Sequence, residues 1–81
     1  MFQHDFKAGD RVRITNVASH MYGPDSFDEG DISVVLSAEP LMGFIPGVLV
    51  KATKSTVSPG LRELGVPFAS IDLNMLTKVE G

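Results

Sequence analysis

The chain carries two histidines, His4 and His20, the residue type best suited to proton transfer near neutral pH. His20 lies near Asp25 in a long polar segment, but a catalytic role would also need a nucleophile and an oxyanion hole. No Gly-x-Ser-x-Gly motif or comparable signature accompanies it. The pattern favours an exposed loop histidine at 20, a histidine in a frayed terminus at 4, and a chain that is not an enzyme.

Four acidic residues gather around Gly30 in the same polar segment. They are Asp25, Asp28, Glu29 and Asp31. Aligned with a calcium-binding EF-hand loop, Phe27 occupies a required ligand position and Leu36 replaces the bidentate glutamate at the twelfth. The chain also has no cysteine for a thiolate site, and its glycines lack the spacing of a phosphate-binding loop. We expect a solvated acidic turn without metal or cofactor, with incidental divalent-cation binding as the minor alternative.

Four basic residues could form a patch on an otherwise acidic chain. They are Arg11, Arg13, Lys51 and Lys54. Such a patch could contact phosphates or an acidic protein. Nucleic-acid binding is disfavoured because the net charge is −3, and because the one strand-centred aromatic, Phe68, is expected in the core rather than exposed for base stacking. Ordinary solvated strand faces are the favoured interpretation of these charges.

An apolar segment between Pro40 and Pro46 is the strongest functional signal. Its large side chains are Leu41, Met42, Phe44 and Ile45. A small domain cannot easily bury all four in addition to its core, and contiguous exposed apolar surface usually marks an interface. Two interpretations stay open. The segment forms a partner-binding surface, with Tyr22 and Phe27 from the preceding long loop nearby, or it plugs one open end of a barrel.

Length and composition place all these residues in one small domain. The 81 residues leave no room for a second domain, so residues 1–81 are expected to form a single unit. No apolar run of about 18 residues predicts a membrane span, and the N-terminus lacks the pattern of a secretory signal. Because small domains in oxidising compartments usually carry disulfides, the absence of cysteine favours an intracellular, cytoplasmic location.

Short apolar alternations separated by glycine, proline, aspartate and serine predict an all-β fold. The five expected strands are Arg11–Val17, Ile32–Leu36, Gly47–Thr53, Val66–Ala69 and Leu73–Lys78. A serine, a proline and a closing glycine predict one short helical turn over residues 59–64. These elements together predict a small antiparallel β-domain with one helical interruption.

The two-residue period of a strand assigns each side chain to one face. In the first and third strands the residues expected to face inward are Val12, Ile14, Val48, Val50 and Ala52. In the second strand the inward set is Ile32, Val34 and Leu36, whereas Ser33 and Ser37 face outward. Val35 breaks this alternation, which suggests partial cover on both faces.

Two stretches resemble parts of SH3-like barrels, including those of the KOW type. Residues 6–14, Phe-Lys-Ala-Gly-Asp-Arg-Val-Arg-Ile, are similar to the first strand of many such barrels. Residues 68–76, Phe-Ala-Ser-Ile-Asp-Leu-Asn-Met-Leu, are similar to the end of SH3 domains, where a 3₁₀ turn leads into the last strand. The general pattern is also similar to small SH3-like proteins encoded by tailed phages. The resemblance implies a five-stranded SH3-like barrel.

The same resemblance does not carry over the peptide-binding activity of SH3 domains. Those domains bind proline-rich peptides in an aromatic groove that includes a tryptophan, and this chain has none. The family's groove-forming proline, asparagine and tyrosine would fall at Ala69, Ile71 and Asp72. We therefore hypothesise a non-enzymatic protein-interaction module or accessory factor that binds and modulates a larger protein, with self-association as a variant. A nucleic-acid-binding barrel is the alternative.

Overall fold

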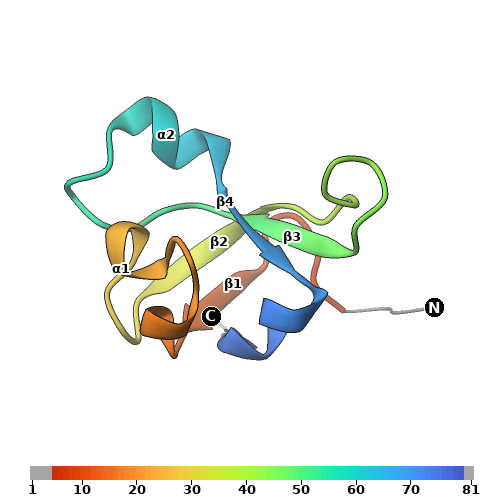
Figure 1. Cartoon of the computed structure of the whole chain (residues 1–81), viewed down its shortest axis with the longest axis horizontal. Coiled ribbons are helices and arrows are strands. Elements are labelled where there is room, and N and C mark those ends of the chain that lie inside the picture. Colours follow the sequence, from red (N-terminus) through yellow and green to blue (C-terminus); the bar gives the residue numbers. More distant parts are fainter. Residues whose placement is uncertain (1–4, 80–81) are drawn as a thin grey trace.

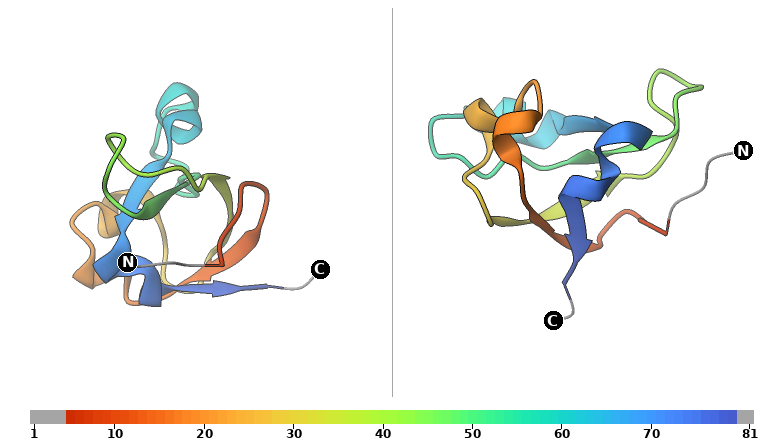
Figure 2. Two further views of the ribbon diagram at one scale, coloured as in Figure 1. Left: turned by 90° about the vertical axis from the view of Figure 1, so that its right-hand side faces the viewer. Right: turned by 60° about the horizontal axis from the view of Figure 1, so that its bottom comes forward.

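A computed structural model describes residues 5–79, which form one five-stranded antiparallel sheet (Figure 1). The strands are β1 (Arg11–Ile14), β2 (Ile32–Ser37), β3 (Gly47–Val50), β4 (Val66–Ala69) and β5 (Leu76–Lys78). Their order across the sheet is β4-β3-β2-β1-β5, and the sheet curls around the core (Figure 2). Within the described part of the chain no ladder joins β4 to β5, so the sheet is a half-barrel. The predicted all-β character and the five strands are confirmed.

Four short helical elements connect the strands. They are η1 (Val17–Ser19), α1 (Gly23–Ser26), α2 (Pro59–Leu64) and η2 (Ser70–Met75), where η denotes a 3₁₀ helix. Helix α2 confirms the helical turn predicted over residues 59–64, and η2 confirms the 3₁₀ turn expected before the last strand. None of the helices in residues 5–79 is long and apolar enough to cross a membrane.

Three predicted strands are longer than the strands observed. β1 ends at Ile14 because Asn16 adopts a left-handed backbone conformation, with φ of 57°, and η1 begins directly after it. β3 ends at Val50, and Thr53 instead donates its backbone N–H to the Ser26 carbonyl at the end of α1. β5 starts only at Leu76, because η2 occupies the preceding residues.

The faces predicted for Ile32, Ser33 and Val34 of β2 are wrong, and Val35 is fully covered rather than partly covered. Ser33 pairs with the buried Val12 of β1, and residues opposite each other in an antiparallel pair point to the same face. Val35 therefore faces inward and is 1% exposed, whereas Ile32 faces outward and is 40% exposed. Ser33 can lie on the inner face because its hydroxyl donates a hydrogen bond to the Lys51 carbonyl, which offsets the cost of burying a polar group.

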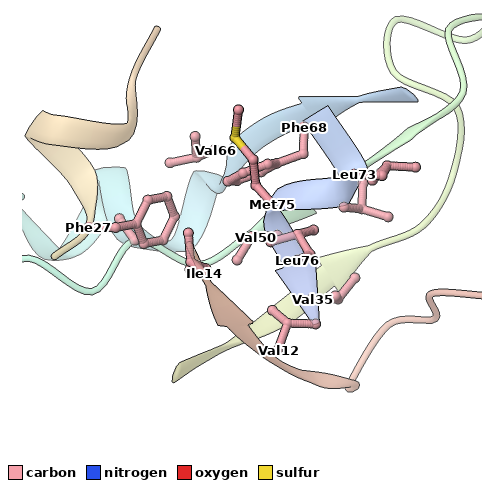
Figure 3. Close-up of a cluster of buried hydrophobic side chains, with 12 residues drawn as sticks. Val12, Ile14, Phe27, Val35, Val50, Val66, Phe68, Leu73, Met75 and Leu76 are labelled. Carbon is pink, nitrogen blue, oxygen red and sulfur yellow. The ribbon is translucent and has the colours of Figure 1, made fainter. Parts of the chain in front are cut away.

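The core lies inside the curl of the sheet and draws on every strand (Figure 3). The buried apolar residues are Val12, Ile14, Phe27, Val35, Val48, Val50, Ala52, Val66, Phe68, Leu73, Met75 and Leu76. The inward residues predicted for β1 and β3 are all among them, which confirms the two-residue pattern there. Within this cluster Phe27 and Phe68 pack with ring centroids 5.9 Å apart.

His20 is buried, contrary to the exposed loop position predicted for it. Its side chain is stacked on Phe68, with ring centroids 4.4 Å apart, and the residue is 6% exposed. The backbone N–H of Tyr22 donates to Nδ1 at 3.1 Å, so Nε2 carries the proton and donates to the Pro67 carbonyl at 2.9 Å. His20 thus attaches the β1–β2 connection to the edge strand β4. His4 lies outside the described residues.

We predict that His20→Ala lowers the free energy of unfolding by about 2–4 kcal/mol, because it leaves a cavity beside Phe68 and removes the partners of two backbone groups. Urea denaturation followed by circular dichroism measures the change. Met21→Ala is the matched control in the same segment, since Met21 is 81% exposed and its truncation should change stability by less than about 0.5 kcal/mol. Equal stabilities of the two variants would contradict the structural role of His20.

The turn before β1 is held to β5 by Asp10. Its carboxylate accepts the backbone N–H of Lys7 at 2.9 Å and lies 3.4 Å from the Lys78 ammonium group. The pKa of Asp10 lies below its ordinary value, chiefly because of the Lys7 hydrogen bond and to a smaller degree because of the charge of Lys78. This carboxylate therefore contributes stability above its unfolded-state pKa, and the contribution is lost as the pH falls through its folded-state pKa.

We expect an NMR titration of the Asp10 carboxyl group to give a midpoint below the ordinary value of 3.8. Lys78→Met should raise that midpoint only slightly, because the variant loses the Lys78 charge but keeps the hydrogen bond from the Lys7 backbone amide. A midpoint at or above the ordinary value in the unmodified chain would show that the turn does not hold this hydrogen bond in solution.

Candidate interaction surfaces

Residues 41–45 form a tight hairpin between β2 and β3, here called the 41–45 hairpin. Leu41 and Ile45 exchange both backbone hydrogen bonds, at 2.6 and 2.9 Å. The Phe44 N–H donates to the Leu41 carbonyl at 3.1 Å and closes a β-turn whose central residues, Met42 and Gly43, have φ of 53° and 86°. The segment therefore has a defined backbone, and it projects away from the sheet (Figure 1).

The side chains of the 41–45 hairpin divide into an anchor and a tip. Leu41 and Ile45 are half-buried, and the Leu41 side chain lies against Gly47, where a Cβ would meet its Cδ1 at 2.9 Å. Met42 and Phe44 are 84% and 74% exposed. The hairpin is thus neither wholly a plug nor wholly a free surface, because its base packs on the sheet and its tip presents two large apolar side chains.

Met42 is an unusual residue for the first central position of this turn. A left-handed backbone costs a non-glycine residue roughly 1–2 kcal/mol, and asparagine or aspartate usually occupies such positions. The exposed Met42 side chain gains no burial that would offset this cost. Strained backbone of this kind clusters at ligand-binding and switch sites in proteins, so the tip is a candidate interaction site.

The turn conformation can be tested with two Gly→Ala substitutions. Gly43→Ala should lower the free energy of unfolding by about 1 kcal/mol, because alanine disfavours its φ of 86° although no atom lies within 4 Å of the place that the new Cβ would take. Gly60→Ala, in the first turn of α2 and equally open, should raise it by roughly 0.5 kcal/mol. Chemical denaturation measures both. A Gly43→Ala chain as stable as Gly60→Ala would contradict the left-handed turn.

Tyr22 and Phe27 do not lie beside the 41–45 hairpin, as the sequence suggested they would. Phe27 is 1% exposed and belongs to the core. Tyr22 is 50% exposed, but it directly precedes α1 at the other end of the molecule (Figures 1 and 2). The only aromatic that the hairpin presents is therefore Phe44.

A second apolar surface, not predicted from the sequence, lies between α1 and α2. It is an open groove of about 800 Å³, here called the α1–α2 groove. Its apolar lining residues are Tyr22, Pro24, Ala52, Val57, Leu61, Leu64, Val66 and Pro67. Leu61 and Leu64 remain 58% and 67% exposed, so a leucine pair three residues apart on a short helix faces solvent rather than the core.

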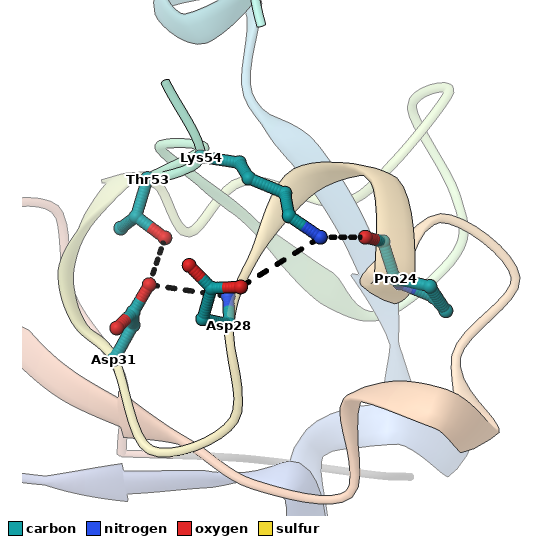
Figure 4. Close-up of polar contacts among 5 residues, drawn as sticks. All are labelled: Pro24, Asp28, Asp31, Thr53 and Lys54. Carbon is teal, nitrogen blue, oxygen red and sulfur yellow. Dashed lines mark hydrogen bonds and ion pairs between the residues drawn. The ribbon is translucent and has the colours of Figure 1, made fainter. Parts of the chain in front are cut away.

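Polar contacts hold the α1 side of this groove in place (Figure 4). The Lys54 ammonium group donates to the Pro24 carbonyl and lies 3.7 Å from the Asp28 carboxylate. The Asp31 carboxylate accepts the Thr53 hydroxyl at 2.7 Å and the Asp28 N–H at 3.1 Å. These acidic side chains thus stabilise the connection between β1 and β2. Residues 5–79 contain no group of three or more metal-binding side chains.

The helix α2 side of the groove is tied to the chain that follows β3. Glu63 forms an ion pair with Lys51 at 3.1 Å, and Arg62 donates to the Ser55 carbonyl at 3.1 Å. Glu29, also in the acidic segment, accepts the backbone N–H groups of Asn16 and Val17 at 3.0 and 3.1 Å. Both walls of the groove are therefore fixed by contacts to neighbouring segments.

The four basic residues singled out in the sequence lie in two separate parts of the molecule, the outer face of the sheet and the α1–α2 groove. Arg11 and Arg13 are exposed on the outer face of β1. Lys51 follows β3, and its N–H donates to the Val34 carbonyl, which places Val34 between Lys51 and Arg11 across the sheet. Lys54 instead lines the α1–α2 groove. Lys51 and Lys54 each pair with a carboxylate, so only part of their charge faces an incoming ligand.

Searches against protein-family models, curated proteins and solved structures find no match to this chain. The two candidate surfaces are therefore defined by their own geometry: the 41–45 hairpin at one end of the half-barrel and the α1–α2 groove at the other.

Proposed function

We propose that this chain is a non-enzymatic protein-interaction module, an accessory factor that binds and modulates a larger protein through the tip of the 41–45 hairpin. The observation that carries the proposal is the exposure of Met42 and Phe44, 84% and 74%, on a turn with a defined backbone. Methionine and aromatic side chains are enriched at the centres of protein interfaces, and methionine adapts to irregular pockets.

The energetics of the tip support binding by insertion. Covering a large apolar side chain contributes roughly 1.5–3 kcal/mol, so Met42 and Phe44 together supply a useful share of a binding free energy. The hydrogen bonds between Leu41 and Ile45 hold the turn before any partner arrives, which reduces the ordering cost of association. A partner with a concave apolar pocket would cover both side chains at once.

The finer identity of the fold belongs to the same proposal. An SH3-like barrel is supported by the five-stranded curled sheet and by the 3₁₀ helix η2 directly before the last strand. Peptide recognition of the SH3 type is not part of the proposal, because Ala69, Ile71 and Asp72 stand where that family's groove residues would fall. The likeness to accessory proteins of tailed phages stays a prediction.

Nucleic-acid binding has less support as an alternative function. It would need Arg11, Arg13, Lys51 and Lys54 to contact phosphates together. Lys54 lies apart from the outer sheet face, and Lys51 shares its charge with Glu63. Ile32 and Val34, which lie opposite Arg13 and Arg11 on β2, make the middle of that face apolar rather than basic. Two separated basic sites give weaker attraction for a phosphate backbone than one continuous patch.

We expect Met42→Ser combined with Phe44→Ser to abolish capture of a partner from a lysate of cells that contain the natural complex, because both inserted side chains are removed. The matched control is Ile71→Ser, since Ile71 is 84% exposed and belongs to η2 rather than to the hairpin. Immobilised unmodified chain, double variant and control are compared by mass spectrometry of the captured proteins.

The outcomes separate clearly. Proteins captured by the unmodified chain and by Ile71→Ser, but absent from the double variant, support the hairpin as the contact. The same set captured by all three proteins would overturn it. Circular dichroism confirms that each variant keeps the fold, and this is expected because all three substituted side chains are exposed.

A further inference from the structure

The α1–α2 groove exposes apolar side chains that the described part of the chain does not cover. Tyr22, Leu61 and Leu64 are 50%, 58% and 67% exposed along it. A volume of about 800 Å³ lies within the range of pockets that enclose whole ligands, so the groove has room for a turn carrying two large side chains. Its walls are braced by the contacts of Lys54 and of Glu63, so the groove is preformed.

The same chain carries a protrusion of matching chemistry. Residues 40–46 contain no charged side chain, and Met42 and Phe44 at their tip are the two most exposed large apolar side chains of the β2–β3 connection. The hairpin and the groove lie at opposite ends of a molecule that measures 36 Å in its longest dimension (Figure 1). A hairpin therefore cannot enter the groove of its own chain, but it can enter that of a neighbour.

We infer that the α1–α2 groove receives the 41–45 hairpin of a second copy of this chain, so that copies associate head to tail. Charges at the two margins are compatible with this docking. Glu39 is exposed at the base of the hairpin, and Lys54 lines the rim of the groove. Asp25, the other charged lining residue, belongs to α1, and Asp28 lies 3.7 Å from the Lys54 ammonium group, so Lys54 attracts Glu39 only in part and the docking rests on the apolar side chains.

The apolar area available to this contact is small. Five side chains that are half or more exposed would be covered: Tyr22, Met42, Phe44, Leu61 and Leu64. At about 100–150 Å² each, they give on the order of 600 Å², well under the roughly 1,200–2,000 Å² of stable interfaces. The association is therefore weak and concentration-dependent, with a dissociation constant between about 10 μM and 1 mM.

The contact joins two different surfaces, so it is heterologous and generates a ring or an open line of copies. It also occupies the Met42 and Phe44 tip, which the proposed function assigns to a larger partner. Self-association and partner binding are then mutually exclusive at that hairpin. The inference itself does not require the proposed function, because it rests on the groove and on the hairpin of the same chain.

Sedimentation equilibrium of the full chain, from about 10 μM to 1 mM, tests the association, with the dissociation constant expected in the range given above. Phe44→Ser removes the hairpin contact, and Leu61→Ser with Leu64→Ser removes the groove contact. Each variant alone should be monomeric at all concentrations. An equimolar mixture should form a pair and stop at two subunits, because one variant retains only a groove and the other only a hairpin.

Three outcomes would overturn the inference: a monomer throughout the series, a groove variant that still self-associates through hairpin-to-hairpin contact, or a mixture of the variants that stays monomeric. Partner capture distinguishes this inference from the proposed function. The groove variant keeps Met42 and Phe44, so it should still capture a partner. A monomeric chain that captures a partner defeats only self-association, and an associating chain that captures nothing defeats only the proposed function.

Discussion

The packing of His20 against Phe68 and the edge of β4 is the contact on which the rest of this small fold depends. Within residues 5–79 no ladder joins β4 to β5. Helix η2 connects the two strands and contributes Leu73 and Met75 to the core, and the β1–β2 connection packs on β4 through His20. His20 makes this possible because its two ring nitrogens bond to Tyr22 and to Pro67 while its ring covers Phe68. The same contact places Tyr22 at the start of α1, so it also positions one wall of the α1–α2 groove.

Local signals predicted the parts of the fold that are set by local chemistry. A proline at the first helical position and Gly65 at the end define α2, and the short apolar run at residues 66–69 defines β4. The faces of β2 could not be read in this way, because Ile32, Val34 and Leu36 outweigh Val35 in apolar content. Pairing with β1 decides the register instead, and a serine hydroxyl bonded to a backbone carbonyl removes the penalty of the inward serine.

The two candidate surfaces differ in the same way: local sequence signals predict one of them and not the other. An apolar run between two prolines is a local signal, and it singled out residues 41–45 while leaving open whether they form a surface or a plug. The α1–α2 groove is made by tertiary structure, because its residues come from separate parts of the chain. Leucines three residues apart on a helix ordinarily indicate a buried face. Here α2 is too short and too far from the curl of the sheet to bury Leu61 and Leu64. The exposure of these two leucines depends on tertiary structure, so no local sequence pattern predicts it.

The distribution of apolar surface follows from the size of the core. Twelve buried apolar residues fill the curl of the sheet without any side chain from residues 41–45. The Leu41 side chain packs against Gly47, where any larger residue would collide with the Phe68 carbonyl. The tip of the hairpin is then left outside, on a turn whose backbone is costly for methionine. Asparagine or glycine would adopt this backbone at a lower cost, so position 42 is one where the residue present is not the one that stability alone would favour.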